Sequence, residues 1–328
     1  MRSSIKGIKA SAFEIHQVPK HKSRYKALNW LCLGIVLIPI VSFIVFNGFP
    51  VLLSFISMFT SIDNNNISSM EWNGFQNFAE VFRDELFWKS WLNTLIIGSS
   101  QFVTLIVALI ISVMLEQNVK GAKVLQVIYF IPYICSSVAV AIMWQWVFNT
   151  GNGVLNAILG KIELNSQTGE LWYMEWLNSM EHPRRLVFAI YVTIMWQAPA
   201  YGIVMFKAAL KNVNPSLYEA ASLDGAGAFA KFRHVTMPAI KSVFLFLLLC
   251  SITNGLAVFD SVKVLAPLSW TQEAGPENVA LTINYYIYNK GVASMDMELA
   301  AVASWVLFIV SFVCSFPVIL ARNKAAEA

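Results

Sequence analysis

Residues 91–115 read WLNTLIIGSSQFVTLIVALIISVML, a stretch of 25 residues without a charged side chain. The hydrocarbon layer of a membrane is about 30 Å thick and a helix rises 1.5 Å per residue, so about 20 apolar residues cross it. This stretch alone predicts a membrane-spanning helix. Further stretches of the same kind would exclude a soluble fold.

Five further stretches share this apolar, charge-free character. They are residues 27–62, 124–148, 186–206, 242–259 and 299–321. Only 13% of the 328 residues are charged, whereas soluble domains carry about 25%. The sequence therefore predicts an all-α membrane protein with six transmembrane helices. Prolines inside these stretches remove backbone hydrogen bonds and predict kinks or breaks in the first, third and fourth spans. They are Pro39, Pro50, Pro132 and Pro199.

The distribution of lysine and arginine predicts the orientation, because these residues collect on the cytoplasmic side. With the N-terminus in the cytoplasm, the segments on that side hold 16 of the 23 basic residues. These segments are 1–26, 116–123, 207–241 and 322–328. We expect both termini in the cytoplasm, a permease domain over 27–321 and a short tail over 322–328. The basic segment 1–26 is read either as an anchor on anionic lipid or as a docking surface for a partner subunit.

Signatures of catalysis and of metal binding are missing from the sequence. Gly160-Lys161 lacks the glycine and the serine or threonine of a phosphate-binding loop, and neither HExxH nor GxSxG occurs. We expect no enzyme activity and no metal site, and the net charge of +4 is too small to indicate nucleic-acid binding. The cysteines fall inside apolar stretches and are expected to be small core residues; they are Cys32, Cys135, Cys250 and Cys314.

The loop between the fourth and fifth spans is the most informative segment. Residues 212–238 read NVNPSLYEAASLDGAGAFAKFRHVTMP. Asn214 and Pro215 predict the start of a helix, and Gly225 and Gly227 permit the left-handed backbone that ends one. A second amphipathic helix follows, with Phe229 and Phe232 beside Lys231 and Arg233. Physical reasoning alone leaves open a helical loop that lies on the lipid surface.

Glu219-Ala220-Ala221, Gly225 and the exit Thr236-Met237-Pro238 resemble the EAA loop of the membrane subunits of binding-protein-dependent ABC importers. Val235 and Met237 stand where that family has isoleucine and leucine. Further matches indicate the carbohydrate branch, the maltose- and glycerol-phosphate-type permeases. They are residues 72–78 (WNGFQNF), 93–94 (NT), 129–132 (YFIP), 260–264 (DSVKV), 275–278 (GPEN) and 285–288 (YYIY).

The resemblance implies a type I ABC importer permease fold in the cell inner membrane. Half of the pore would come from a second homologous permease, and a solute-binding protein would deliver the carbohydrate from outside. ATP and magnesium would be held by a separate cytoplasmic ATPase dimer, against which the loop docks as a coupling helix. Glu219 would pair with a basic residue of the ATPase, and Gly225 would make the turn. The implied coupling residues are Leu217, Tyr218, Glu219, Ala220, Ala221, Leu223, Asp224 and Gly225.

Polar residues within spans are costly unless they face protein or water, so they are candidates for a substrate path. Aromatic rings are added because they stack on the apolar faces of sugars. The predicted path residues are Trp144, Gln145, Gln197, Tyr201, Asn254, Phe259 and Asp260, with Asn93, Gln101 and Trp196 as further candidates. The competing interpretation is that these residues bridge helices or lie at the membrane interfaces.

Three alternative functions compete with this interpretation, and the sequence argues against the first two. An ion-coupled carrier would need charges buried within its spans, and the six stretches contain none. A membrane-bound enzyme would need a catalytic constellation. An ABC importer of an acidic oligosaccharide or a sugar phosphate agrees with the same sequence, because a partner subunit could supply a basic residue to the pore.

Overall fold

The computed structural model describes residues 22–61, 69–116, 121–164, 171–266 and 273–327. Most of them are helical. Five helices are long and apolar enough to cross a membrane, and a sixth span forms if one bent pair of helices is counted. The five are Leu28–Ser57, Glu85–Glu116, Arg184–Lys211, Ala228–Leu265 and Met297–Lys324. The helical membrane fold predicted from the sequence is therefore confirmed, with the third span as the bent pair. The chain divides into two compact units, Met1–Ser54 and Phe55–Ala328.

The described part of the first unit is one long helix, interrupted by a single wide turn, whose last residues extend into the second unit. Helix α1 covers Lys22–Phe43, a π-helical turn η1 covers Ile44–Gly48, and α2 continues over Phe49–Ser57. The chain stays helical at Pro39, whereas the wide turn lies just before Pro50. None of the most apolar part of this span is buried. So large an apolar surface requires apolar surroundings. The basic segment 1–21 lies outside the described residues.

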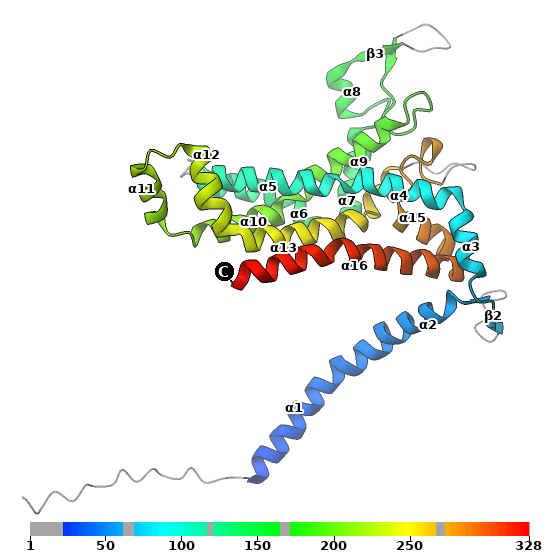
Figure 1. Ribbon diagram of the computed structural model, residues 1–328. Helices are drawn as coiled ribbons and strands as arrows, with labels where there is room; N and C mark the ends of the chain where they lie inside the picture. The colour runs from blue at the N-terminus through cyan, green and yellow to red at the C-terminus, as the bar shows by residue number, and fades with distance from the viewer. Residues whose placement is uncertain (1–21, 62–68, 117–120, 165–170, 267–272, 328) are drawn as a thin grey trace, which may run out of the picture. The chain divides into compact units, whose positions relative to one another are not determined.

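Four spans form the body of the second unit (Figure 1). Helices α4 (Glu85–Gly98) and α5 (Ser100–Glu116) make one, and α9 (Arg184–Gln197) with α10 (Pro199–Lys211) make another. The others are α13 (Met237–Leu256) and α16 (Met297–Glu327). Helix α5 packs against α10 and α13, and α13 packs against α16. The predicted break at Pro199 is present, because α9 ends at Gln197 and Pro199 starts α10.

Glycines allow the spans to approach closely. A Cβ atom added at Gly98 of α4 would stand 2.5 Å from the carbonyl oxygen of Gly255 in α13. One added at Gly202 of α10 would stand 2.8 Å from the Cβ of Ala108 in α5. Helices in lipid associate through close packing rather than through the hydrophobic effect, which favours small residues at their contacts. These glycines therefore set the distances between the spans that carry the site described below.

The third predicted span is not straight. Helix α6 (Ala122–Ile134) and α7 (Ser137–Val147) meet at 101°. Pro132 lies inside α6, so the break comes after the proline, beyond the end of that helix. Cys135 and Ser136 are both extended there, with ψ of 146° and 138°. The amide of Gln197 in α9 donates a hydrogen bond of 3.1 Å to the Cys135 carbonyl, which satisfies one backbone group freed by the break.

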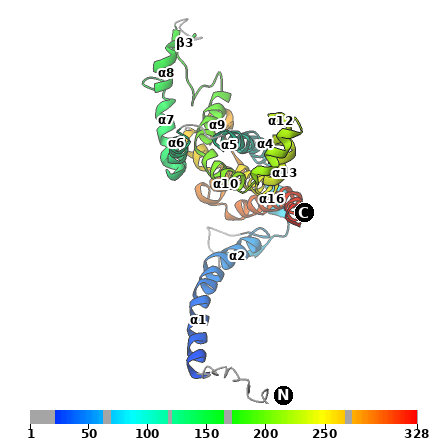
Figure 2. The ribbon, with the colours of Figure 1, turned by 90° about the vertical axis from the view of Figure 1, so that its left-hand side faces the viewer.

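Short elements collect at the two ends of the bundle (Figure 1), and some project from one side of it (Figure 2). At one end, α11 (Pro215–Leu223), α12 (Ala228–Lys231) and a π-helical turn η4 (Phe232–Thr236) lead into α13. At the other end, the described residues form β1 (Thr60–Ser61), β2 (Glu71–Trp72), α3 (Gln76–Arg83), α14 (Asp260–Leu265), η5 (Pro276–Asn278), α15 (Ile283–Tyr288) and η6 (Asn289–Ala293). Three more elements project from the side of the bundle: α8 (Val154–Leu159), β3 (Lys161–Leu164) and β4 (Leu171–Tyr173). The strands pair antiparallel as β1–β2 and β3–β4.

Polar contacts join the loop after α14 to the bundle. The Asn93 amide donates hydrogen bonds to the carbonyls of Asn278 and Leu281, at 2.8 and 3.1 Å. The amide of Ile283 donates to the hydroxyl of Thr94 at 2.8 Å. The sequence makes Asn93 a candidate pore residue because it is polar and lies in a span. Its side chain is instead buried and anchors this loop.

Asp84 makes a second set of polar contacts between the same loop and the bundle. Its carboxylate accepts hydrogen bonds from the Leu86 amide and the Tyr286 hydroxyl, at 2.9 and 2.8 Å, and Lys290 Nζ lies 3.2 Å away. Burial alone would raise the pKa of Asp84, but the hydrogen bonds and Lys290 outweigh it and hold the pKa below its ordinary value. Burial and the neighbouring carboxylate raise the pKa of Tyr286 far above its ordinary value.

The cysteines are not core residues, contrary to prediction. Cys32, Cys135 and Cys314 are exposed on the chain, and Cys250 is half-buried. In a chain surrounded by lipid, the outer surface of a helix is as apolar as its core. Hydrophobicity therefore does not distinguish the two positions.

Candidate coupling and translocation sites

The segment Pro215–Leu223 forms the helix α11 that the sequence predicts, and its ends are fixed by local chemistry. The Asn214 side chain accepts a hydrogen bond from the Ser216 amide at 3.0 Å, and Pro215 is the first helical residue. At the other end, the Gly225 amide donates to the Ser222 carbonyl and the Ala226 amide to the Ala221 carbonyl. This pair of bonds is the Schellman motif, which needs a left-handed residue. Gly225 supplies it, with φ of +77°.

Gly227 has a different role from the one predicted. Its φ of −70° and ψ of 173° are open to any residue, and it precedes the first turn of α12 as the N-cap. The reversal of the chain between α11 and α12 therefore depends on Gly225 alone among the glycines of this loop.

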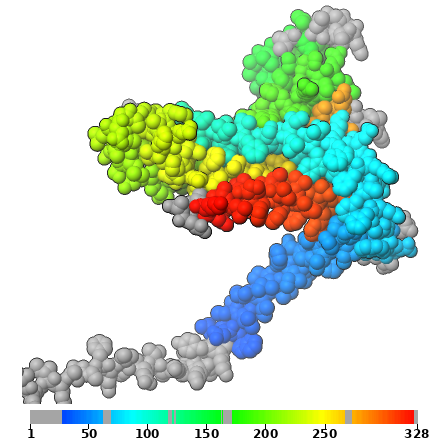
Figure 3. Space-filling model, viewed as in Figure 1, coloured from blue at the N-terminus to red at the C-terminus, as the bar shows by residue number. Residues whose placement is uncertain are grey.

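Helix α11 has no buried residue, and it projects from one end of the bundle (Figure 3). Leu223 is 90% exposed and Leu217 50% exposed, and Phe229 of α12 is 74% exposed. The acidic side chains Glu219 and Asp224 are exposed beside them, as is Ala220. An exposed apolar patch with carboxylates around it is typical of a surface that binds another protein.

Two side-chain hydrogen bonds fix α11 to the segment that follows it. The hydroxyls of Tyr218 and Thr236 lie 3.0 Å apart, and Lys231 Nζ donates to the Ser222 hydroxyl at 2.8 Å. Tyr218, predicted as a docking residue, is half-buried and contacts the chain's own η4. Residues 215–236, called the coupling hairpin below, are therefore internally braced. Helix α13 continues directly from η4, since the Met237 amide donates to the Phe232 carbonyl.

A cavity of about 210 Å³ lies between α5, α9, α13 and α14, and it brings together several predicted path residues. Helix α13 ends at Leu256 and α14 starts at Asp260, so the chain is unwound between them. Four of the seven predicted residues line the cavity: Gln197, Asn254, Phe259 and Asp260. Gln101 lines it as well, with Ser137 and Ser261.

A second cavity of about 170 Å³ shares Gln101, Ala198 and Asn254 with the first and extends along α5 and α10. Tyr201, a fifth predicted residue, lines it beside Tyr133. These two rings are stacked, with centroids 6.2 Å apart. Tyr133 is not among the residues that the sequence predicts for the path. Its position directly after the matched stretch 129–132 would have been the only signal.

The remaining predicted residues lie outside the linings of these two cavities. Trp144 packs on Phe148 and Trp196, with ring centroids 5.3 and 5.8 Å apart. The Gln145 amide donates to the Val264 carbonyl at 3.3 Å. Both residues sit on α7 and connect it to its neighbours, which is the bridging role of the competing interpretation.

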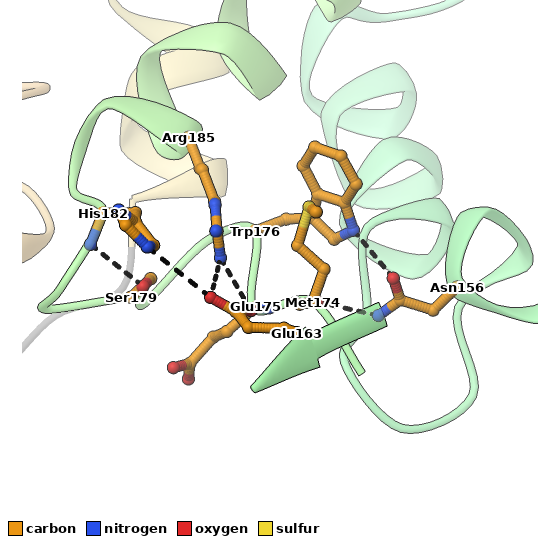
Figure 4. Close-up of polar contacts among 8 residues, drawn as sticks. All are labelled: Asn156, Glu163, Met174, Glu175, Trp176, Ser179, His182 and Arg185. Carbon is orange, nitrogen blue, oxygen red and sulfur yellow. Dashed lines mark hydrogen bonds and ion pairs between the residues drawn. The ribbon is translucent and has the colours of Figure 1, made fainter. Parts of the chain in front are cut away.

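An insert between α7 and α9 forms a small folded unit that projects from one side of the bundle, away from the coupling hairpin (Figures 1 and 2). Asn156 is 1% exposed and organises it (Figure 4). Its amide donates to the carbonyls of Thr150 and Met174, at 3.0 and 2.8 Å, and its oxygen accepts from Trp176 Nε1 at 3.0 Å.

Charged residues tie the same insert to α9. Arg185 Nη1 contacts both oxygens of Glu163, at 2.6 and 2.7 Å, and His182 Nε2 lies 3.8 Å from the same carboxylate (Figure 4). Ligand atoms of Glu163, Glu181 and His182 come within 4.8 Å of one another, as metal ligands would. Arg185 already compensates the Glu163 charge, so this cluster is best described as an ion-pair network that holds the insert.

A bundle of membrane spans with a polar cavity, and a braced hairpin exposed at one end, defines a polytopic transport subunit. Comparison with known families agrees. Residues 104–323 match the binding-protein-dependent transport system inner membrane component family. The chain belongs to this family and is accordingly an inner membrane component of a transport system.

Curated relatives and solved structures are of the same kind. The sn-glycerol-3-phosphate transport system permease protein UgpA of Yersinia enterocolitica is 29% identical over 242 residues, which cover 74% of this chain and 77% of that protein. UgpA of Shigella flexneri is 29% identical over 256 residues, covering 77% and 80%.

The fold also matches two structures of a bacterial ABC transporter. One is described as involved in the import of the acidic polysaccharide alginate, with a TM-score of 0.73 and 22% identity, covering 92% of this chain and 98% of that one. The other holds a bacterial alginate ABC transporter in complex with an alginate pentasaccharide-bound periplasmic protein, with a TM-score of 0.69 and 23% identity, covering 92% and 95%. They support the type I importer permease fold.

Proposed function

We propose that this chain is one of two permease subunits of an ATP-driven, binding-protein-dependent importer of a carbohydrate. The observation that carries the proposal is that a single helix, α13, connects the coupling hairpin to the polar cavity. The coupling hairpin is exposed at one end, and the helix that continues from it bears Asn254 in the polar cavity. Force applied to the hairpin would therefore reach the cavity through one helix.

The hairpin is proposed to dock in a cytoplasmic ATPase dimer, which holds ATP and magnesium. Leu217 and Leu223 supply the apolar contact, and Glu219 and Asp224 supply charges for basic residues of the ATPase. Placing this end in the cytoplasm follows the distribution of lysine and arginine along the chain. Both termini are then cytoplasmic, and the insert that holds Glu163 and Arg185 faces the solute-binding protein.

The cavity supports a carbohydrate as the cargo. Amide, hydroxyl and carboxylate groups line it beside Phe259 and Tyr201, and polar groups set among aromatic rings are typical of sites for small polar molecules. The relatives are named for the transport of sn-glycerol-3-phosphate, and the solved structures are of an alginate importer. The family therefore leaves open whether the carbohydrate is neutral or acidic. The cavity is half of a pore, and a homologous permease would complete it.

Charge reversal at Glu219 tests the coupling role. In proteoliposomes that hold the complete importer, Glu219→Lys should lower ATP-dependent uptake of a labelled saccharide by about tenfold or more, because a buried interfacial charge pair becomes a repulsive one. Glu116→Lys is the matched control, since Glu116 is exposed at the end of α5 and outside the hairpin. Equal uptake by Glu219→Lys and wild type would refute docking through α11.

A further inference from the structure

The cavity between α9, α13 and α14 carries a single formal charge among its described lining residues, and that charge is negative. Asp260 supplies it, and the other polar lining groups are the neutral side chains of Gln101, Gln197, Asn254, Ser137 and Ser261. The adjoining cavity has no charged residue among the described residues of its lining. The part of the pore that these residues build therefore offers an anion no positive side chain.

Lys263 is the nearest cation along the chain, and it is engaged elsewhere. Its Nζ donates to the Tyr285 hydroxyl at 3.2 Å and lies 4.7 and 4.6 Å from the ring centroids of Tyr285 and Tyr288. Cation–π contacts and this hydrogen bond hold the ammonium group against α15. Among the described residues, neither Lys263 nor any other cation forms an ion pair with Asp260.

The polar groups of the cavity match a hydroxyl group, which both donates and accepts hydrogen bonds. Asp260 can only accept, whereas the amides of Gln101 and Asn254 can do both. Gln197 gives an amide hydrogen to the Cys135 carbonyl, which leaves its oxygen to accept. A cargo with several hydroxyls satisfies these groups together. Phe259 adds an apolar surface for the C–H groups of a sugar ring.

An acidic cargo fits the same cavity poorly. A carboxylate or phosphate only accepts hydrogen bonds, so it would compete with Asp260 for donors and be repelled by its charge. A helix N-terminus can bind an anion, but the first turn of α14 already carries Asp260 itself, which offsets the partial positive charge there.

We infer that the cargo of this importer is an uncharged, polyhydroxylated saccharide, and that Asp260 selects it by accepting hydrogen bonds from neighbouring sugar hydroxyls. The inference rests on the proposed function and names its substrate class. The names of the relatives and of the solved structures leave the charge of the cargo open, and the inference assigns the uncharged class.

The test uses the complete importer, with its binding protein, in proteoliposomes. Radiolabelled neutral trisaccharides (maltotriose, cellotriose, mannotriose and xylotriose) are compared with trigalacturonate, trimannuronate and glycerol 3-phosphate. We expect ATP-dependent uptake of at least one neutral probe and no uptake of the acidic ones above the background without ATP. Asp260→Asn should raise the half-saturating concentration of binding protein loaded with the transported probe about tenfold, because a charge-assisted hydrogen bond is lost.

Two control variants distinguish a loss of cargo selectivity from a failure of the importer to assemble. Asp260→Glu keeps the carboxylate and should stay within about threefold of wild type. Glu71→Gln removes a carboxylate from the exposed strand β2 and should change nothing. Faster uptake of an acidic probe, or an unchanged half-saturation value in Asp260→Asn, overturns the inference and leaves the proposed importer intact. ATP-dependent uptake of no probe at all overturns the carbohydrate importer itself.

Discussion

At the scale of the residue, the coupling hairpin depends on one backbone conformation. Gly225 has φ of +77°, and a Cβ at that position would meet no atom within 4 Å. The obstacle to substitution is therefore the backbone itself, since a left-handed conformation costs an L-residue about 1–2 kcal/mol. Asparagine tolerates this region better than most residues, and a β-branched residue tolerates it least.

Valine at this position should disturb the hairpin, whereas asparagine should not. We expect Gly225→Val to reduce coupled ATP hydrolysis and uptake by about tenfold, since about 1.4 kcal/mol corresponds to a factor of ten. Gly225→Asn should stay within about threefold of wild type, because asparagine tolerates the left-handed region. Reconstituted importer provides both measurements, with membrane insertion checked by the yield of folded protein.

Gly227→Val is the matched control for this series. Gly227 lies two residues away in extended backbone and also has open space around it. Its valine variant should keep transport near that of wild type. If the two valine variants lost activity equally, bulk rather than conformation would be the cause.

Sequence reasoning at this scale succeeded where the chemistry is local. Asn214, Pro215 and Gly225 act on backbone groups within a few residues of themselves, so their roles could be predicted from spacing. The residues that line the cavity were harder to predict from the sequence. Helices in lipid are apolar on every side, so hydrophobicity does not show which residues point inward. Trp144 and Gln197 looked equally suitable, yet of the two only Gln197 lines the cavity.

At the scale of the element, α4 and α13 meet backbone to backbone at Gly98 and Gly255. An added Cβ would stand 2.5 Å from backbone in one case and 2.9 Å in the other. Backbone cannot rotate aside as a side chain does, so any larger residue must push the helices apart. Gly255 directly follows Asn254, so this contact also sets one wall of the cavity.

Alanine at either glycine should destabilise the bundle. We expect Gly255→Ala and Gly98→Ala to lower the free energy of unfolding by about 1–3 kcal/mol, as overpacking does. A thermal melt of the purified chain in detergent would show this as a lower Tm. Gly34→Ala is the control, because a Cβ added at Gly34 would meet no atom within 4 Å and alanine favours a helix. A Tm for Gly255→Ala equal to wild type would contradict the close approach.

The position of the bend between α6 and α7 could not be predicted from the sequence of that span alone. Pro132 acts on the turn before it, because its ring crowds the carbonyl four residues earlier. The break instead follows Ile134, and Ser136, although serine is common at helix starts, makes no side-chain cap hydrogen bond there. Its support comes from Gln197, 62 residues further along the chain. Contacts of that range are invisible to local pattern reasoning.

At the scale of the whole molecule, the loop after α14 is fastened to the bundle by Asp84, Tyr286 and Lys290. Asp84 and Tyr286 are 202 residues apart in the chain. The contact closes a long section of chain that includes both cavities. Loss of this contact should therefore lower the stability of the entire second unit.

The Asp84 contact predicts a pH dependence. Because the folded-state pKa lies below the ordinary 3.8, the stabilisation is complete above that value and is lost as the pH falls through the folded-state pKa. Asp84→Asn keeps an N-cap for α4 but loses the charge, which should cost about 1–2 kcal/mol at neutral pH. Melts in detergent should show a lower Tm for the variant at neutral pH and a much smaller difference once the pH falls below the folded-state pKa. A difference independent of pH would exclude the charged contact.

The continuity of α12, η4 and α13 has a mechanical consequence. Residues 228–256 are helical without a break, although α12 runs steeply to α13 (Figure 1). Helix α13 itself, Met237–Leu256, is about 30 Å long at 1.5 Å per residue, with Asn254 near its far end. A swing of only about 10° around the first turn of α13 would carry its far end sideways by about 5 Å. A small rotation of the hairpin, driven by ATP hydrolysis in the proposed ATPase partner, would thus change the width of the cavity at Asn254 without a flexible hinge inside α13.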